Sequence, residues 1–381
     1  MKRPNGYALI ILIFSTILTC SCNGKIDMNE KLSNNRHTEN ERITFKEGKK
    51  IKELLFNFNK LKLPNEDRRF VQIELNSKFK LGGVNNELLL TPSFVKVDKN
   101  KNIYVLDNID SSVKKFDNMG HYVEKYGKKG AGPGEFERAW NFDVSVDGVT
   151  VISSPNNNKF AVFDRDEIIE FKPIDMAINL CFTTTGEVLI FQIADLINKS
   201  PFRRIDYKKD IIIEYQNILK TKKNEGMLPF LMGDVHRYRD NNIVYISQIM
   251  GYIVIYDDDG KIVSVFRLID KVVHSGLTKR EEKIAGFSSP LVRFPREDEY
   301  LFFVSNIFED NLYILKNNEK TDSNEYIIDI YSLSEAGYKY SLLLKTLGEI
   351  KSVYFTSTNL YVVKANTEVE VFEYNILEKA I

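Results

Sequence analysis

One repeated stretch constrains the fold of this chain more than any other feature. Residues 94–127 read FVKVDKNKNIYVLDNIDSSVKKFDNMGHYVEKYG, and residues 140–171 read WNFDVSVDGVTVISSPNNNKFAVFDRDEIIEF. Each copy holds four short runs of alternating apolar and polar residues separated by Asp, Asn and Gly, which is typical of antiparallel strands joined by turns. The Phe-Asp pairs beginning at Phe116 and Phe163 lie about 47 residues apart, a spacing found for repeated four-stranded sheets. Because one small sheet cannot bury both faces, the copies must stack on each other.

Weaker copies of the same unit follow along the chain. Their turns use the same residues: Asp257 to Gly260 repeats the turn at Asp117 to Gly120. We expect the strands of the third to sixth units at 178–183, 188–192, 203–207 and 211–215; 235–238, 243–246, 252–256 and 262–268; 291–294, 300–304, 311–315 and 326–331; and 350–355, 360–364 and 369–374. Longer inserts at 216–233, 269–290 and 333–349 should decorate this core, and Thr278 to Ile284 has helical character.

The sixth unit is one strand short, and the missing strand can come from the other end of the chain. Phe70 to Leu75 alternates in strand fashion and precedes the first unit without a sheet of its own. An unpaired edge would expose backbone groups, so this strand should complete the last sheet and close a ring. The sequence therefore predicts an all-β fold, a six-bladed β-propeller of four-stranded antiparallel blades closed by an N-terminal strand.

The amino terminus reads as a targeting segment rather than part of the fold. A basic start at Lys2 and Arg3 is followed by an apolar run from Tyr7 to Leu18, which is too short for the roughly 20 residues of a membrane-spanning helix. The segment resembles a bacterial lipoprotein signal with Cys22 as the lipid-bearing residue; Cys20 is the second choice, and an ordinary cleaved secretion signal is the alternative. We expect a signal peptide at 1–22, a flexible tether at 23–42 and the propeller domain at 43–381. Cys181 would then be the only thiol of the mature chain, in a packing role.

The first two units carry a family resemblance. Ile103 to Asp107, Val113 to Asp117, Gly120 and the stretch Gly127 to Phe136, which contains GAGPGEF, resemble the six-bladed propeller lipoproteins of Bacteroides-type bacteria, whose blades look like NHL repeats. The second unit departs from this pattern, with Ser153 and Ser154 where the first has Leu106 and Asp107. The resemblance implies the fold and a lipid-anchored place in the cell envelope at the outer membrane, on its periplasmic or surface side.

Several function classes lack their sequence signatures. With 53 basic and 53 acidic residues the formal net charge is +0, so we predict no nucleic-acid partner. The Gly-rich stretch lacks the Gly-Lys-Ser/Thr of a phosphate loop, and the Asp257 turn lacks the later Glu of a calcium loop. His37, His121, His236 and His274 have no paired metal-ligand spacing, and no nucleophile elbow occurs. We predict no catalytic residue, no metal site and no cofactor.

Topology gives the best place to look for a ligand. Turns between second and third strands emerge on the same face as connections between blades, so Asp110, Asn157, Arg138 and Trp140 should gather around one mouth of the central channel. An indole beside guanidinium and amide groups suits a sugar or a peptide. The alternative is that Trp140 packs between blades.

These observations favour a lipid-anchored binding or scaffolding module with a glycan, a peptide or an outer-membrane protein as partner. A hydrolase or lyase with its active site in the central channel is the competing hypothesis.

Overall fold

The structure is a computed structural model. It describes residues 41–43, 67–83, 88–171, 176–193, 202–209, 211–215, 233–249, 251–270, 277–284, 287–292, 300–316, 325–345, 348–365 and 367–380. The predicted signal peptide with Cys20 and Cys22, and nearly all of the predicted tether, lie outside these residues, as do His37 and His274. Within the described ranges, no helix has the length and hydropathy needed to cross a membrane.

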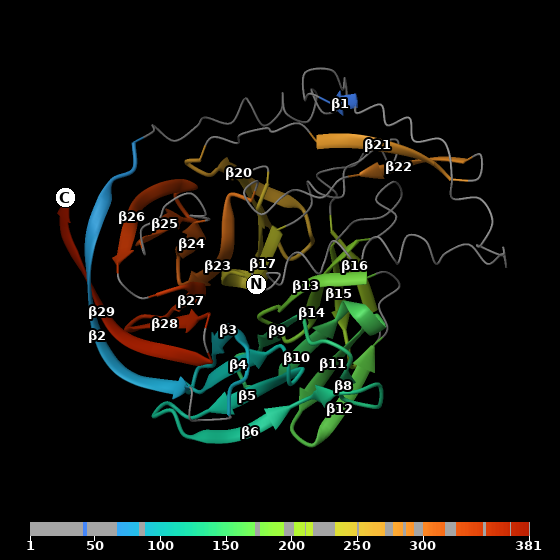
Figure 1. The fold of residues 1–381 in the computed structure, drawn as a ribbon, viewed down its shortest axis with the longest axis horizontal. Helices are drawn as coiled ribbons and strands as arrows, with labels where there is room; N and C mark the ends of the chain where they lie inside the picture. The colour runs from blue at the N-terminus through green and yellow to red at the C-terminus, as the bar shows by residue number, and fades with distance from the viewer. Residues whose placement is uncertain are drawn as a thin grey trace, which may run out of the picture.

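Six four-stranded antiparallel blades surround a central axis (Figure 1). The first strand of each blade lies innermost, as the ring of β3, β9, β13, β17, β23 and β27 around the centre of the view shows. Blade I consists of β3 (Pro92–Val97), β4 (Ile103–Asp107), β5 (Ser112–Phe116) and β6 (Tyr122–Tyr126). Blade II consists of β9 (Asn141–Val144), β10 (Thr150–Ser154), β11 (Lys159–Asp164) and β12 (Glu167–Phe171). Blade III consists of β13 (Met176–Phe182), β14 (Val188–Ile193), β15 (Phe202–Asp206) and β16 (Ile211–Glu214). Blade IV consists of β17 (Gly233–Arg237), β18 (Ile243–Ser247), β19 (Tyr252–Tyr256) and β20 (Ile262–Arg267). Blade V consists of β23 (Phe302–Phe308), β24 (Asn311–Lys316), β25 (Glu325–Ser332) and β26 (Gly337–Lys345). Blade VI consists of β27 (Ile350–Phe355), β28 (Asn359–Lys364), β29 (Glu368–Ala380) and β2 (Phe70–Gly82).

Short elements occupy some connections. The link between blades I and II contains the parallel pair β7 (Lys128–Lys129) and β8 (Glu135–Phe136), and the 3-10 turns η1 (Pro155–Asn157) and η3 (Arg239–Asn241) lie in blades II and IV. A separate small sheet joins β1 (Glu41–Ile43), β21 (Leu277–Ile284) and β22 (Phe287–Val292).

The predicted strands of blades I to IV and VI are confirmed, whereas blade V was assigned wrongly. Its first strand is β23, and Leu291 belongs to β22 outside the blade. Its outer strand is β26, which lies within the predicted insert 333–349. The run Ser341-Leu342-Leu343-Leu344 within β26 lacks strict alternation and fits a buried helix as readily as a strand.

The helical expectation for Thr278 to Ile284 is also wrong, because these residues form β21. Strand β21 pairs with both β1 and β22. These partners supply backbone hydrogen bonds, whereas an isolated helix this short would be marginal in water.

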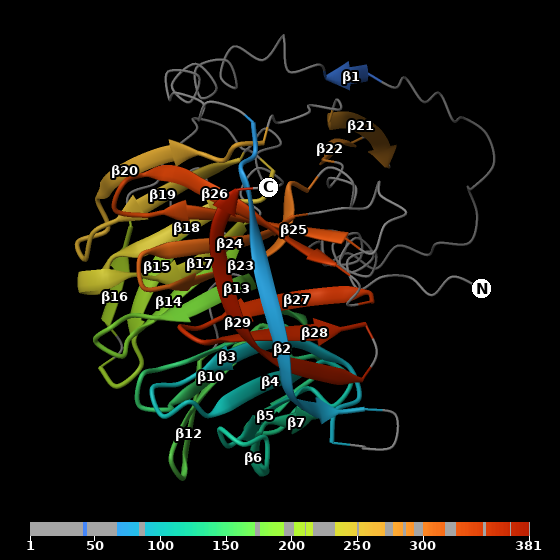
Figure 2. The ribbon, with the colours of Figure 1, turned by 90° about the vertical axis from the view of Figure 1, so that its left-hand side faces the viewer.

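The chain ends meet as predicted. In blade VI, β2 pairs antiparallel with β29 over most of its length, with Leu75 opposite Tyr374 and Leu81 opposite Val369. Both strands are 13 residues long and run beyond the blade as a ribbon, which Figure 2 shows crossing the front of the molecule. At its start β2 also pairs in parallel with β26, through Phe70 and Val71, so blades V and VI share one eight-stranded sheet.

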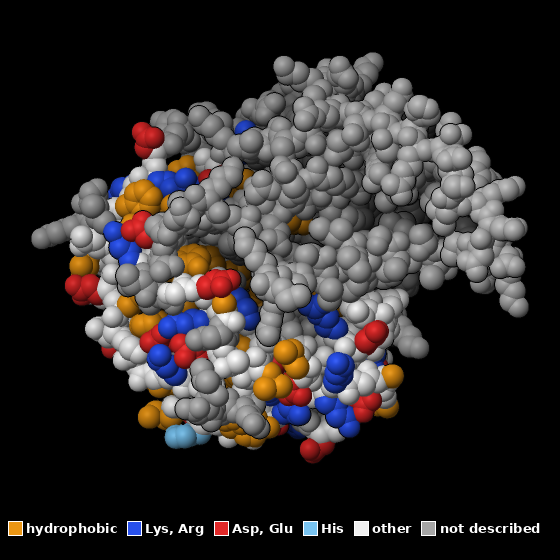
Figure 3. Space-filling model, viewed as in Figure 1, with side chains coloured by type: hydrophobic (Ala, Val, Ile, Leu, Met, Phe, Trp, Pro, Cys, Tyr) orange, Lys and Arg blue, Asp and Glu red, His pale blue; other side chains and the backbone are white. Residues whose placement is uncertain are grey.

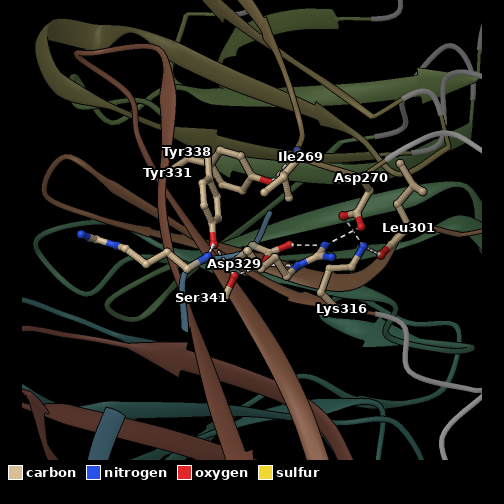
Figure 4. A network of polar contacts seen from close by, with 10 residues as sticks. Ile269, Asp270, Leu301, Lys316, Asp329, Tyr331, Tyr338 and Ser341 are labelled. Atoms are coloured by element: carbon tan, nitrogen blue, oxygen red, sulfur yellow. Dashed lines mark hydrogen bonds and ion pairs between the residues drawn. The ribbon is translucent and has the colours of Figure 1, made fainter. Parts of the chain in front are cut away.

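A polar network fixes the start of β2 (Figure 4). Arg68 donates hydrogen bonds from Nε and Nη2 to the carboxylate of Asp329, both at 3.0 Å, and from Nη2 to Asp270. Lys316 bonds the other oxygen of Asp270, and Ser341 Oγ donates to Asp329 at 2.6 Å. Asp329 is fully buried, so its charge depends on these donors. The network therefore ties the approach to β2 to blade V and to the end of blade IV.

Apolar side chains fill the spaces between blades, and aromatic residues predominate. Blades III and IV meet through Phe191, Phe202, Tyr245, Tyr252 and Tyr256, with Cys181 buried in the same cluster as predicted for a packing role. Each fully buried side chain of this size stabilises the fold by about 1.5–3 kcal/mol. The abundance of Phe and Tyr thus reflects sheets that pack face to face.

Candidate functional site

The residues proposed from topology lie where blade I passes to blade II. The backbone N–H of Trp140, just before β9, donates to the carbonyl of Ser153 at 2.9 Å. Ser153 and Ser154 end β10, and η1 follows at once with Asn157 as its last residue. Trp140 and Asn157 therefore lie at the same end of the β9–β10 pair, as the order of strands in a blade requires.

Arg138 and Trp140 contact each other directly. The guanidinium carbon of Arg138 lies 5.1 Å from the centre of the Trp140 ring, within the range of a cation–π interaction. Both side chains are half-buried. The apolar cluster between blades I and II contains Phe136, Ala139 and Phe142 but does not contain Trp140. The indole thus stands beside the core of this boundary and keeps part of its surface accessible.

Three polar atoms in the link and at this end of blade II have no hydrogen-bond partner among the described residues. They are Nη1 of Arg138, Oγ of Ser154 and Oδ1 of Asn157, and each atom is buried. Ser154 lies two residues after Ile152 in β10, so its side chain faces the same side of the blade, toward the link that carries Arg138. Since buried polar atoms are normally paired, this group has unused hydrogen-bonding capacity.

Asp110, the fourth residue proposed, has its bonding capacity used within blade I. Its carboxylate accepts a hydrogen bond from Ser112 at 2.9 Å and lies 3.1 Å from Lys114 Nζ and 3.6 Å from Lys125 Nζ. Burial favours the neutral acid, but the hydrogen bonds from Ser112 and Lys114 outweigh it and lower the pKa of Asp110. The structure therefore places Arg138 against Trp140 and sets Asn157 at the same end of blade II, while the carboxylate of Asp110 is bonded within blade I.

The Gly-rich stretch before Trp140 acts as a connector, as predicted. Gly132 offers its carbonyl to Lys159 Nζ at 2.9 Å and its N–H to Glu135 at 2.9 Å, while the N–H of Gly134 donates to Glu170 at 2.8 Å. A side chain at Gly130, where φ is +156°, would place its Cβ 2.1 Å from a Glu135 carboxylate oxygen. These groups hold the link against blade II and leave its amides paired, which is unlike a phosphate loop.

A ring of polar contacts around the axis was not predicted. At every boundary between blades, a side chain of one inner strand reaches the inner strand of the next blade. From blade I onward the contacts are Lys96 Nζ to Asp143 Oδ1 (3.5 Å), Asn141 Nδ2 to Asn179 Oδ1 (2.7 Å), Asn179 Nδ2 to the Gly233 carbonyl (3.2 Å), Ser305 Oγ to Asp234 Oδ2 (2.7 Å), Asn306 Nδ2 to the Phe355 carbonyl (3.1 Å) and Ser352 Oγ to the Ser93 carbonyl (2.5 Å).

The boundary between blades IV and V contains the residues that most resemble catalytic groups. Ser305 Oγ donates to Asp234 and lies 2.8 Å from Nε2 of His236. Burial raises the pKa of Asp234, and burial together with the charge of Lys96 lowers the pKa of His236 well below its ordinary value. A serine nucleophile must donate its proton to the histidine base, whereas this hydroxyl donates to the carboxylate. The arrangement joins two blades, and its imidazole is neutral.

The metal-ligating side chains, the exposed histidine and the surface charges were also considered as sites. Among the described residues, no three His, Cys, Asp or Glu side chains are grouped so as to hold a metal ion. His121 is exposed and bonds Asp117 in the turn that joins β5 to β6. On the described part of the face in Figure 3, basic and acidic side chains are interspersed.

The comparisons with known proteins agree on the fold. Residues 80–264 match the model of a family described as a 6-bladed beta-propeller. A member of the duf4221 family from Bacteroides vulgatus is similar at 11% identity with a TM-score of 0.53, covering 81% of this chain and 99% of that one. A Bacteroides fragilis protein provisionally described as exported is similar at 14% identity with a TM-score of 0.50, covering 81% and 100%.

A third similar structure is the virginiamycin B lyase of Staphylococcus aureus, at 11% identity and a TM-score of 0.49, covering 79% of this chain and 99% of that chain. No curated protein sequence matches significantly. At these identities the similar structures speak to the fold alone. The family match and the strand order identify the chain as a six-bladed β-propeller.

Proposed function

We propose that this chain is a binding module of the cell envelope, anchored by lipid at Cys22, that holds a glycan or a peptide at the surface formed by Arg138, Trp140 and Asn157. We call this surface the Trp140 face. It lies on a rigid scaffold, because β9 and β10 of blade II fix its position.

One observation carries the proposal. Trp140, the only Trp of the chain, is half-buried outside the apolar cluster beside it, next to buried polar atoms that have no partner. Ligand sites combine apolar or aromatic surface with a few polar groups of unused hydrogen-bonding capacity. A tryptophan that only filled space between blades would belong to that cluster.

The envelope location is supported by the amino terminus, whose basic start, short apolar run and Ser21-Cys22 fit a lipoprotein signal. Fractionation tests this part of the proposal. Cys22→Ala should release the protein from membranes, whereas Cys20→Ala should leave it bound. Release by both variants, or by neither, would contradict anchoring at Cys22.

A glycan and peptide array with the purified full chain tests the binding role. Trp140→Ala should weaken the hits at least about tenfold, because truncating a central Trp of a binding site costs about 2 kcal/mol or more. Tyr122→Ala is the matched control, since Tyr122 is an exposed aromatic residue on the outer strand β6. Hits that survive Trp140→Ala unchanged would disprove the Trp140 face.

The competing enzyme hypothesis makes a different prediction for the same ligands. A hydrolase or lyase would convert them, and substitution of the axial residues Asp234, His236 or Ser305 would abolish turnover. A binding module leaves its ligands intact.

A further inference from the structure

Arg138 carries a charge that no described residue neutralises. Among the residues the structure describes, it makes no hydrogen bond and no ion pair, and its guanidinium lies over the Trp140 ring. Its guanidinium is half-buried, and burial lowers its pKa. Several other arginines with buried guanidinium groups are paired: Arg68 bonds Asp329, Arg203 pairs with Glu214, and Arg204 pairs with Asp258 and Glu187. Arg237 and Arg267 also have no ion pair among the described residues, but of these three unpaired arginines only Arg138 lies over an aromatic ring there.

An unpaired, partly desolvated guanidinium is costly in isolation, because it has lost water without gaining an anion. Its planar fork of donors matches a carboxylate, which it can bind through two parallel hydrogen bonds. Trp140 keeps the guanidinium in place without neutralising it, since a ring offers no hydrogen-bond acceptor of that strength. The position is thus prepared for an anion that the protein itself does not supply.

We infer that the ligand of the Trp140 face is a carboxylate-bearing saccharide, a chain containing uronic acid residues, with its carboxylate on Arg138. This inference rests on the proposed binding function and names its ligand class. The groups around Arg138 favour a saccharide over an acidic peptide. Trp140 offers aromatic surface of the kind that sugar rings use, and its ring lies against the guanidinium that would hold the carboxylate.

The test compares oligogalacturonate with the same oligomer fully methyl-esterified, by isothermal titration with the full chain. The ester keeps the sugar and removes the charge. The free acid should bind about ten- to a hundredfold more tightly than the ester, as expected for a charge-assisted bidentate pair. Arg138→Gln should abolish this difference, so that the acid and the ester bind with the same affinity.

Arg267→Gln provides the matched control. Arg267, at the end of β20 in blade IV, is also half-buried without an ion pair among the described residues, and burial also lowers its pKa. Its substitution should leave the preference for the acid intact. Arg138→Lys should keep only part of the preference, because an ammonium keeps the charge but loses the fork.

The possible failures can be told apart. Equal affinity for acid and ester, with both lost in Trp140→Ala, would overturn the acidic ligand and keep the binding face. An acid preference that survives Arg138→Gln, or a poly-glutamate peptide that competes as well as the oligosaccharide, would also overturn the inference. Absence of any Trp140-dependent ligand on the array would defeat the proposed function itself.

Discussion

At the scale of single residues, buried polar groups distinguish the two best-matched repeats. Asp107 ends the second strand of blade I, is fully buried, and accepts hydrogen bonds from the N–H of Leu90 at 2.7 Å and from Lys114 Nζ at 3.0 Å. Ser154 ends the corresponding strand of blade II, and its hydroxyl has no partner. Asp107 thus ties the connection from blade VI to blade I, whereas the Gly-rich link makes the corresponding contacts of blade II through Lys159 and Glu170.

We expect the two positions to respond differently to alanine. Asp107→Ala should lower the free energy of unfolding by about 2–4 kcal/mol, because it leaves the amides of Leu90 and Thr91 without an acceptor and removes one of the two carboxylates beside Lys114. Ser154→Ala should change it by no more than about 0.5 kcal/mol, since no hydrogen bond is lost. Urea denaturation measures both. Equal losses would show that Asp107 does not hold the connection.

The sequence did not predict the individual side-chain contacts between blades. Asn141 and Asn179 bond across a blade boundary at 2.7 Å, and Asp234 meets Ser305 in the same way. Their spacing along the chain depends on inserts of irregular length, so no fixed period reveals these pairs. Asp110 was predicted to face the ligand, but its neighbours Lys114 and Lys125 take up its carboxylate.

At the scale of elements, the predicted strands were correct wherever alternation was regular. The closing strand was predicted from a count of three strands in the sixth blade, and the structure extends it to Gly82. Strand β26 was not predicted, because the run of leucines at 342–344 does not alternate with polar residues as a half-buried strand does. Its place in the fold depends on pairing with β25, which directly precedes it, and with β2, which lies near the amino terminus.

Arg68 should matter for this closing element. Arg68→Ala should lower the free energy of unfolding by about 3 kcal/mol, because Asp329 is fully buried and would lose its cationic partner. Lys99→Ala is the control, since the pair of Lys99 with Asp147 is exposed and should contribute at most about 1 kcal/mol. Thermal and urea unfolding of both variants measure the difference. If both substitutions lowered the free energy of unfolding by a similarly small amount, the polar network around Asp329 would not stabilise the start of β2.

At the scale of the whole molecule, the contacts that close the ring are distinct from the surface proposed to bind a ligand. Contacts around the axis join all six inner strands, and the ribbon of β2 and β29 closes the ring. At the Trp140 face, where blade I passes to blade II, Arg138, Ser154 and Asn157 each have a buried polar atom with no hydrogen-bond partner among the described residues. The closed ring explains how a chain whose later repeats are weak keeps one surface in a fixed geometry.

Hydrogen exchange with and without a ligand from the array tests most directly where this molecule binds. We expect protection confined to the link before β9 and to the turn after β10, around residues 135–158, with the amides of Asp234 to Arg237 and of Ser305 unchanged. Protection centred on those axial strands, with no change around Trp140, would contradict it.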